Sequence, residues 1–426
     1  MTAFPFEREV FPGKSLAFLR PRHQYDAHVR NPPARRCDLL MDFSYPIEAE
    51  AFRIEVRTWL EANLDERFRD LGIHMEAGPE WLEPMREWNH RAADAGYVAI
   101  GWPTEFGGRD ASIIEQVVLA EEIHRARAPG TINLIGIANI APSIIGFGTE
   151  EQKARFLPRM RRGDDIWCQG FSEPDAGSDL ASLRTTAVRD GDYFVVTGQK
   201  VWNTLGHIAN WCELLVRTDT TATKHAGISC LLVDMTLPGI DVRPLVTITG
   251  EREFCELFFN EVRVPVTALL GPEHQGWVVA MTTLANERAR VADLHLQVRG
   301  KIADLLNAAT KHRRDGGTRS TDDPVIRQLL ADLYVRGEYL KLLADRALSD
   351  AIHGLPPGPG SSVVKLLWSE LEQEVGSVAG SVFGADANRG RWGRERVYSR
   401  ALTIAGGTTE INKNIIAQRV LGLPRH

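Results

Sequence analysis

Apolar residues recur at helical spacing in the first well-patterned part of the chain, residues 42–165. In the segment Ile47–Leu64 an apolar stripe steps by three and four residues, and it consists of Phe52, Val56, Trp59, Leu60 and Leu64. Three further segments repeat this period: Trp81–Gly96, Ile113–Ala126 and Gln152–Met160. Such stripes are typical of amphipathic helices that bury one face. We therefore predict an N-terminal helical domain over residues 42–165.

The pattern changes at Ile166, where short β-rich runs replace the helical period. Asp190-Gly191 lies between two such runs, Ala187–Val188 and Tyr193–Val196, and this dipeptide is a strong short-range signal for a β-hairpin. The runs WCELLVRTD, AGISCLLVDM and CELFFNEVRVP follow, separated by Gly, Pro and Asp. We predict a middle antiparallel β domain over residues 166–275.

Helical spacing returns at residue 276. The predicted helices are Gly276–Thr310, Pro324–His353, Ser362–Phe383 and Thr409–Leu421. Polar loops connect them, which favours a C-terminal helical bundle over residues 276–426. The fold class is therefore α+β and mostly α, in the order helical, β, helical. Residues 1–41, rich in Pro and Arg, show neither period, and we interpret them as an irregular N-terminal extension, upstream sequence or a misassigned start.

One carboxylate interrupts an apolar stripe in the first helix of the predicted bundle. The stripe consists of Trp277, Ala280, Leu284, Glu287, Val291, Leu294 and Val298, and the opposite face carries Asn286, Arg290, Asp293 and Gln297. A carboxylate out of water is costly unless it is paired, neutralised or used in chemistry. Glu287 is therefore a candidate catalytic base, and the alternative is an ion pair with a neighbouring arginine such as Arg290.

Composition and charge narrow the function classes. The chain has 426 residues, more than one core usually holds, so two or three domains are expected. A net charge of −6 with interspersed signs gives no indication of nucleic acid or an anionic membrane as a partner. Five scattered cysteines without metal-ligand spacing favour a reduced, cytoplasmic protein. No apolar run is long enough to span a bilayer.

Motifs of several common enzyme classes are absent from the sequence: there is no P-loop, no GxGxxG between a strand and a helix, no HExxH and no GxSxG. The loop WCQGFSEPDAGSD, residues 167–179, places small residues between Ser172 and Ser178. Backbone amides there could approach a phosphate or a heterocycle, and the alternative is a plain polar turn.

Two more clusters could bind a ligand. The segment TGQKVWNTLG ends a strand in Trp202, Asn203 and Thr204, which could hold a flat cofactor unless Trp202 only covers the core. In IAGGTTEINKNIIAQRVLGLP, residues 404–424, two glycines precede a helix capped by Thr408 or Thr409. A glycine-rich approach to a helix N-terminus favours an anion site, and an ordinary capped helix is the alternative.

Together and in this order, the three clusters resemble the acyl-CoA dehydrogenase family, flavoproteins that oxidise the Cα–Cβ bond of acyl-CoA thioesters. The resemblance extends from about Phe43 to the C-terminus, and its most specific parts are FSEPDAGSD, QKVWNT and GGTTEINKNIIAQRVLGLP. It implies an acyl-CoA dehydrogenase-like fold of an N-terminal helical, a middle β and a C-terminal helical domain, with FAD as the cofactor.

The resemblance also implies roles for individual residues. Gln169, Gly170, Phe171 and Ser172 would lie along the isoalloxazine ring, with Ser178 near the pyrophosphate and the substrate. Trp202 would pack on the ring beside Asn203, and Thr204 would hydrogen-bond N5. Thr408 and Glu410 match positions that contact the FAD of a dimer partner. Arg288 matches an arginine associated with the CoA portion of the substrate.

The position of the base distinguishes two branches of that family. Many members place a glutamate immediately before the Gly-Thr of the C-terminal motif, where this chain has Gly406. A second branch, which includes isovaleryl-CoA, long-chain and certain bacterial steroid-side-chain enzymes, carries the base in a Glu-Arg pair on the first long helix of the C-terminal domain. Glu287-Arg288 falls at that place, so the resemblance implies that Glu287 removes the α-proton.

The implied reaction gives a trans-2-enoyl-CoA and passes electrons to electron-transferring flavoprotein. Two family features are missing: KHRRDGGTRSTDD replaces an Arg-Lys-x-Phe-Gly segment, and SVFGADA replaces Gln-x-x-Gly-Gly. Both normally support FAD across a subunit interface, so either a homotetramer or a mixed heterotetramer is expected. A non-catalytic or half-site subunit remains an alternative, as does an oxidase or monooxygenase on the same fold.

Overall fold

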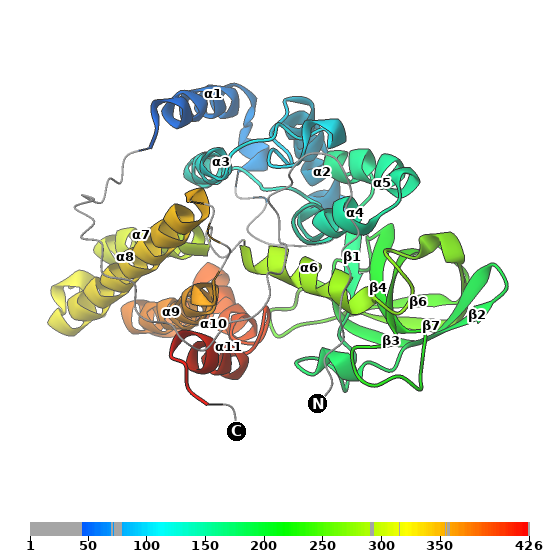
Figure 1. Cartoon of the computed structure of the whole chain (residues 1–426). Helices are drawn as coiled ribbons and strands as arrows, with labels where there is room; N and C mark the ends of the chain where they lie inside the picture. The colour runs from blue at the N-terminus through cyan, green and yellow to red at the C-terminus, as the bar shows by residue number, and fades with distance from the viewer. Residues whose placement is uncertain are drawn as a thin grey trace, which may run out of the picture. The chain divides into compact units, whose positions relative to one another are not determined.

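A computed structural model describes residues 45–69, 71, 79–289, 294–314, 316–353, 355 and 358–424, without the side chains of residues 287–289. Residues 1–41, predicted to be an irregular extension, lie outside the described residues. Along the chain a group of helices is followed by one β-sheet and then by a second group of helices (Figure 1). This order confirms the predicted fold class.

The N-terminal helices follow the predicted stripes closely. They are α1 (Ile47–Asn63), α2 (Pro79–Asp94), α3 (Ile113–Ala126), α4 (Ala141–Phe147) and α5 (Glu150–Arg162), with a π-helical turn at Ile135–Ile140 before α4. Capping boxes begin α3 and α5, where Ser112 pairs with Glu115 and Thr149 with Gln152. Each box satisfies two backbone amides that the first turn of a helix leaves without partners. α4 and the turn before it were not predicted from the sequence pattern.

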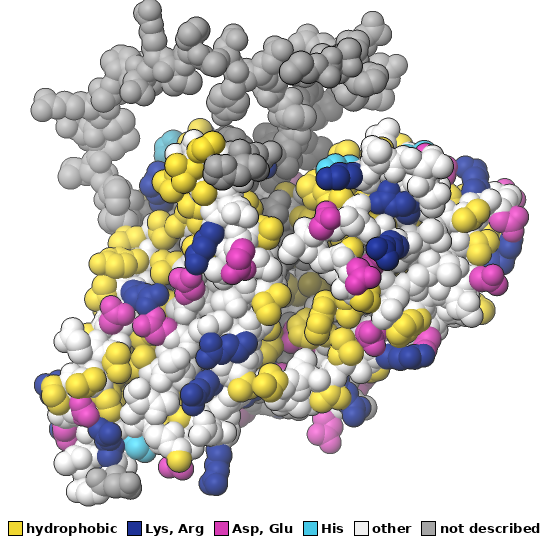
Figure 2. Space-filling view, turned by 90° about the horizontal axis from the view of Figure 1, so that it is seen from below, with side chains coloured by type: hydrophobic (Ala, Val, Ile, Leu, Met, Phe, Trp, Pro, Cys, Tyr) yellow, Lys and Arg dark blue, Asp and Glu magenta, His cyan; other side chains and the backbone are white. Residues whose placement is uncertain are grey.

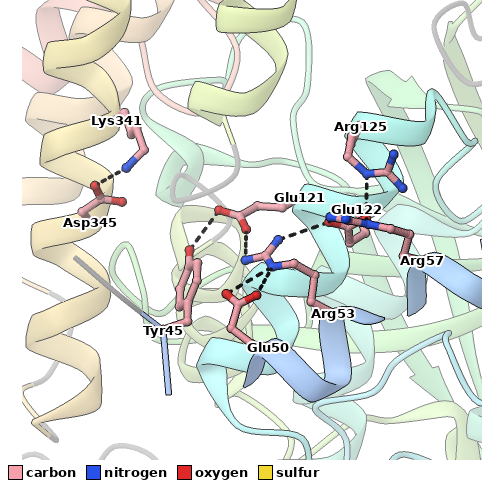
Figure 3. Close-up of polar contacts among 9 residues, drawn as sticks. All are labelled: Tyr45, Glu50, Arg53, Arg57, Glu121, Glu122, Arg125, Lys341 and Asp345. Carbon is pink, nitrogen blue, oxygen red and sulfur yellow. Dashed lines mark hydrogen bonds and ion pairs between the residues drawn. The ribbon is translucent and has the colours of Figure 1, made fainter. Parts of the chain in front are cut away.

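A charge network joins α1 to α3 (Figure 3). Glu122 of α3 is almost fully buried, and it forms ion pairs with Arg53 and Arg57 of α1 and with Arg125 of its own helix. Burial alone would raise the pKa of Glu122, but the three guanidinium groups lower it to about 2. The charge of Glu122 is therefore compensated inside the helical domain.

The middle of the chain forms one sheet of seven strands. They are β1 (Trp167–Gly170), β2 (Thr186–Asp190), β3 (Tyr193–Thr204), β4 (Trp211–Arg217), β5 (Ile228–Asp234), β6 (Ile240–Leu245) and β7 (Phe254–Pro265). Their order is β1-β4-β2-β3-β7-β6, and β5 pairs with β4. The predicted hairpin is confirmed, because Asp190 pairs with Tyr193 at its end.

The sheet departs in one respect from the predicted antiparallel arrangement. Four pairings are antiparallel, whereas β4 runs parallel to β1 and, at one residue pair, to β2. The parallel pair aligns Gln169 with Glu213 and Gly170 with Leu214. A long connection between β1 and β4 allows this direction, and period-two spacing alone carries no information on strand direction.

Alternate residues of the sheet belong to two different apolar cores. Trp167 of β1 and Leu215 of β4 pack with α4, α5 and α6 (Gly276–Ala289), whereas Cys168 and Leu214 pack with β7 on the other side. Because side chains alternate across a strand, Gln169 and Glu213 share the face of Trp167 and Leu215. Both polar residues are therefore on the helix-covered face.

The C-terminal helices after α6 are α7 (Leu294–Lys311), α8 (Pro324–Ile352), α9 (Gly360–Phe383), α10 (Gly390–Leu402) and α11 (Thr409–Ile415), followed by a π-helical turn at Ile416–Val420. The helix predicted over residues 276–310 corresponds to α6 and α7, and residues 290–293 between them lie outside the described residues. α10 was not predicted. Its buried residues are Glu395 and Ser399, so it presents no apolar stripe.

The surface mixes both charge signs. On the face shown in Figure 2, Lys and Arg side chains lie among Asp and Glu side chains. Among the described residues, no helix is both long enough and apolar enough to span a bilayer. Within the same residues, no three His, Cys, Asp or Glu side chains are grouped to hold a metal ion.

Candidate functional site

A buried ion pair ties the end of β1 to the middle of β3. The Nζ of Lys200 donates to Oε1 of Glu173 at 2.8 Å and to the carbonyl of Phe171 at 3.0 Å. Backbone amides of Arg184 and Thr185 donate to the two oxygens of the same carboxylate, at 2.6 and 2.8 Å. The carboxylate thus accepts three hydrogen bonds, and the loop after β1 is fixed against β3.

Electrostatics support a charged pair at this position. Burial on its own would raise the pKa of Glu173, but the ammonium group of Lys200 and the amide donors hold it below its usual value. Burial lowers the pKa of Lys200, opposed by the charge of Glu173. A buried ion pair is tolerated only when its remaining hydrogen-bonding capacity is satisfied, as it is here.

The loop that follows is a tight turn in which the backbone of Glu173 and Ala176 exchanges two hydrogen bonds, at 3.0 and 3.1 Å. At Gly170 a β-carbon would meet the Sγ of Cys212 and a methyl group of Leu214 at 2.8 Å, so no side chain fits there. The carbonyl of Ser172 accepts a bond from the amide of Val201 at 2.9 Å. Ser178, at the far end of the turn, is exposed.

Trp202 departs from ordinary strand geometry. It has a φ of 64° within a bulge between β3 and β7, and its side chain is 61% exposed. A left-handed backbone costs a non-glycine residue roughly 1–2 kcal/mol, and strain of this kind is concentrated at functional sites. The ring of Phe254 meets the Trp202 ring edge-on at 6.0 Å. The indole face therefore remains available as a platform.

The residues beside this platform come from β1 and β3. Asn203, which is buried, donates from Nδ2 to the carbonyl of Gln169 at 2.7 Å, and Thr204 is half-buried. Among the described residues of this region, two buried amide atoms have no hydrogen-bond partner: Nε2 of Gln169 and Oδ1 of Asn203. An unmatched buried donor or acceptor costs about 1–3 kcal/mol and calls for an explanation. A flat heterocycle with donors and acceptors on its edge fits this set of groups.

The predicted base lies on α6. The backbone of Glu287 and Arg288 is in the last turn of that helix, and their side chains lie outside the described residues. The buried face of α6 is rotated about the helix axis relative to the predicted stripe. Val279, Ala280 and Thr283 are fully buried, whereas Trp277 and Leu284 of the predicted stripe are only partly buried. Residue 287 follows Thr283 by four positions, so its Cα lies on this buried face.

The C-terminal motif forms a glycine turn that leads into α11. Gly406 and Gly407 have φ values of 65° and 92°, and Nζ of Lys365 donates to the carbonyl of Gly407 at 2.7 Å. Thr408 is the N-cap, and its hydroxyl accepts from the amide of Ile411 at 3.2 Å. Glu410 is exposed in the first turn, where helix amides and Thr408 lower its pKa.

The predicted residues therefore lie in separate places. Gln169, Phe171, Asn203 and Thr204 are brought together where β1 meets β3, with Trp202 at the surface beside them. Thr408 and Glu410 lie at the start of α11, which packs on α9.

Sequence reasoning missed the Glu173–Lys200 pair and a second buried acid, Glu213, in β4. Glu213 is the one charged residue within the apolar run WCELLV. It carries the same signal that identified Glu287, an acid among apolar positions.

Comparisons with known proteins agree along the described chain. Three family profiles match: "Acyl-CoA dehydrogenase, N-terminal domain" at residues 46–164, the "middle domain" at 168–262 and the "C-terminal domain" at 274–421. The acyl-CoA dehydrogenase IpdE1 of Mycobacterium tuberculosis is 43% identical over 390 residues, which cover 89% of this chain and 98% of that protein.

Two solved structures are similar in fold and sequence. The ChsE4-ChsE5 complex from Mycobacterium tuberculosis contains a chain with a TM-score of 0.79 and 34% identity, covering 91% of this chain and all of that one. The structure described as the "Tcur3481-Tcur3483 steroid ACAD" gives a TM-score of 0.79 at 30% identity, with coverage of 91% and 100%.

Proposed function

Because the chain belongs to the acyl-CoA dehydrogenase family of oxidoreductases, we propose that it catalyses FAD-dependent α,β-dehydrogenation of an acyl-CoA thioester. The product is a trans-2-enoyl-CoA. The observation that carries this proposal is the hydrogen bond from Asn203 to the carbonyl of Gln169, beside the exposed ring of Trp202 with its left-handed backbone. A flat ring stacked on Trp202 would receive hydrogen bonds from groups that β1 and β3 hold in place.

The proposed cofactor site consists of residues from β1, from β3 and from the turn that follows β1. The residues are Gln169, Gly170, Phe171, Ser172, Ser178, Trp202, Asn203 and Thr204. FAD, when bound, takes up the hydride that leaves Cβ of the substrate. The Glu173–Lys200 pair holds the turn in its shape beforehand, so the donors need no rearrangement as charge develops. Thr408 and Glu410 would contact the cofactor of a neighbouring subunit.

Glu287 is the proposed base, with Arg288 and Ser178 as substrate contacts. An α-proton of a thioester is only weakly acidic, so the base must be desolvated to become effective. The burial of Val279, Ala280 and Thr283, on the α6 face that leads to residue 287, supports the proposal. Gly406 has no side chain to offer as a base, and its left-handed backbone disfavours one.

The substrate and partners are proposed from the relatives. One similar structure is described as a steroid enzyme and another as a complex of two chains. We infer a branched, long or steroid-linked acyl group, and a tetramer that is either homomeric or built with a second chain. Electron-transferring flavoprotein is the proposed electron acceptor.

The visible spectrum of the purified chain tests the proposal. We expect flavin absorbance that bleaches on anaerobic addition of one member of an acyl-CoA panel, and Glu287→Gln should retain flavin but bleach at least about 100-fold more slowly. Unchanged bleaching in that variant would remove Glu287 as the base. Flavin that no thioester reduces, both alone and with a co-expressed partner chain, would overturn the dehydrogenase proposal.

The mixed assembly has its own readout. If the chain alone binds no flavin but acquires it when a second dehydrogenase chain is co-expressed, the half-site alternative is favoured. Rapid reoxidation of the reduced enzyme by oxygen would instead favour an oxidase.

A further inference from the structure

Glu213 is a fully buried acid in the middle of β4. Its neighbours on the same face of the strand are Trp211 and Leu215, which belong to the apolar core between the sheet and helices α4, α5 and α6. On the adjacent strands, Gln169 lies opposite it in β1 and Leu232 in β5. A carboxyl group in such surroundings is costly unless it has a role.

A hydrogen-bond chain connects Glu213 to two helices. The hydroxyl of Thr283 in α6 donates to Oε1 of Glu213 at 2.8 Å. The hydroxyl of Ser143 in α4 lies 2.7 Å from the Thr283 hydroxyl and 3.5 Å from the carbonyl of Val279. The side chains of Glu213, Thr283 and Ser143 are completely buried. These hydrogen bonds therefore join β4, α6 and α4 through side chains that water does not reach.

The surroundings of Glu213 contain no compensating charge among the described residues. The groups that face it are the hydroxyl of Thr283 from α6, the amide of Gln169 from β1 and the thiol of Cys230 from β5, whose Sγ is 4.0 Å from Oε1. Within the same part of the chain, Oε2 of Glu213 has no partner and no cation pairs with the carboxyl. Burial raises the pKa of Glu213 to about 8, so the neutral acid predominates at pH 7.

The face of α6 that meets this hydrogen-bond chain carries mostly small side chains. Its buried residues are Gly276, Val279, Ala280 and Thr283, and a β-carbon at position 276 would collide with the backbone of Ser229 at 2.3 Å. Small side chains on this face let the helix approach the sheet closely, and Trp277 and Leu284 beside it pack against the same apolar core. Apolar packing is non-directional, whereas the bond from Thr283 to Glu213 is directional and resists rotation of α6 near the other end of the helix.

We propose that Glu213 is a positioning residue for Glu287, because its bond to Thr283 fixes the rotation of α6 one turn before the base. This inference rests on the function proposed above. Residues four apart share a helix face and are one turn removed, so a small rotation at Thr283 displaces Glu287 by a similar amount. Displacement of a reacting group by about 1 Å can slow a reaction roughly 100-fold. Substrate affinity, which depends on other contacts, should be less affected.

Four single variants of the flavin-loaded protein, together with the double variant of Glu213→Leu and Thr283→Val, separate positioning from simple structural support. Glu213→Gln keeps the acceptor at Oε1, Glu213→Leu removes it, and Thr283→Val removes the donor. Thr282→Val is the matched control, because its hydroxyl donates along its own helix, to the carbonyl of Val278 at 3.2 Å. The measurements are the rate of flavin bleaching by a saturating acyl-CoA from pH 6 to 9, the KM and the amide exchange of α6.

We expect Glu213→Leu and Thr283→Val to bleach about 10- to 100-fold more slowly with KM changed less than about threefold. The double variant should be no slower than either single one, because both remove the same bond. Glu213→Gln should bleach at the wild-type rate and lose the part of the pH profile that arises from Glu213. Faster amide exchange in α6 should accompany the two slow variants and not Thr282→Val.

Wild-type bleaching rates in both Glu213→Leu and Thr283→Val would overturn the proposal, as would additive effects in the double variant. If the wild-type protein itself is bleached by no thioester, the proposed function fails first. The amide exchange of α6 then still decides whether Glu213 fixes that helix, since this readout needs no substrate.

Discussion

Replacement of Glu213 by glutamine should make the stability of the chain less dependent on pH. The wild-type carboxyl has a pKa of about 8 in the folded state against an ordinary value of 4.5, because it is buried without a cation. Since the folded state holds this proton more tightly, its contribution to stability is fully present below pH 4.5 and is lost as pH rises towards 8. The neutral amide of the Glu213→Gln variant has no such proton to lose.

The magnitude follows from the size of the shift. One pKa unit corresponds to about 1.36 kcal/mol, so the wild-type chain should lose about 3 kcal/mol between pH 4.5 and 7 from this group. By pH 8 the loss reaches about 4 kcal/mol, and its limit at higher pH is about 5 kcal/mol. Any difference in packing between the amide and the neutral acid is independent of pH. The slope of the difference between the two proteins is therefore the diagnostic quantity.

Urea unfolding of the apo chain, followed by tryptophan fluorescence from pH 4.5 to 8.5, measures this slope. The difference in unfolding free energy should shift in favour of Glu213→Gln by about 1 kcal/mol per pH unit and level off above pH 8. Glu105→Gln, at an exposed position, is the control and should show no such trend. A constant difference across the range would show that Glu213 is already ionised in the folded state, and would refute the reasoning.

Three other substitutions test parts of the fold and the site. Lys200→Met should destabilise the chain by about 3 kcal/mol and release flavin, because it leaves Glu173 buried without its cation. Lys311→Met, at an exposed position, is the control, and equal losses of stability and flavin in it would contradict this prediction. Glu122→Gln should lower the free energy of unfolding by about 2 kcal/mol at neutral pH. It should also remove the loss of stability that the wild type shows as pH falls from 4.5 towards 2. An unchanged acid transition in this variant would refute the lowered pKa of Glu122. Trp202→Gly should change the stability of the apo chain by no more than about 1 kcal/mol, because relief of the left-handed backbone offsets the lost contact with Phe254. The same substitution should lower flavin affinity about tenfold. Full flavin retention, measured by absorbance, would exclude the Trp202 ring as a platform for the flavin.

The periodic elements could be predicted from sequence, because their signals are local. The stripe of α1 and the turn at Asp190-Gly191 each lie within a few residues. α10 escaped prediction since its buried positions are Glu395 and Ser399, which form ion pairs and hydrogen bonds rather than an apolar face. The direction of β1 was equally hidden, because alternation is the same in parallel and antiparallel strands.

In the candidate site, too, the local motifs could be predicted from sequence and the contacts between distant residues could not. Trp202 and the loop after β1 were identified from motifs, but their geometry depends on Lys200, which meets Glu173 across 27 positions of sequence. Glu213 depends on Thr283, 70 positions away. Neither separation leaves a periodic trace. An isolated charge in an apolar run was the available signal, and it identifies a residue that needs a partner without naming the partner.

The left-handed backbone at Gly406 bears on where the proposed base can stand in this chain. A chain that acquired a glutamate at this position while keeping a φ of 65° would incur roughly 1–2 kcal/mol of strain before its carboxylate could contribute anything. The neighbouring Gly407, at 92°, and its hydrogen bond from Lys365 hold the turn in that conformation. If Glu287 is the base, as proposed, a carboxylate moved to position 406 would carry this backbone strain unless the turn were remodelled as well, so the present turn favours glycine there.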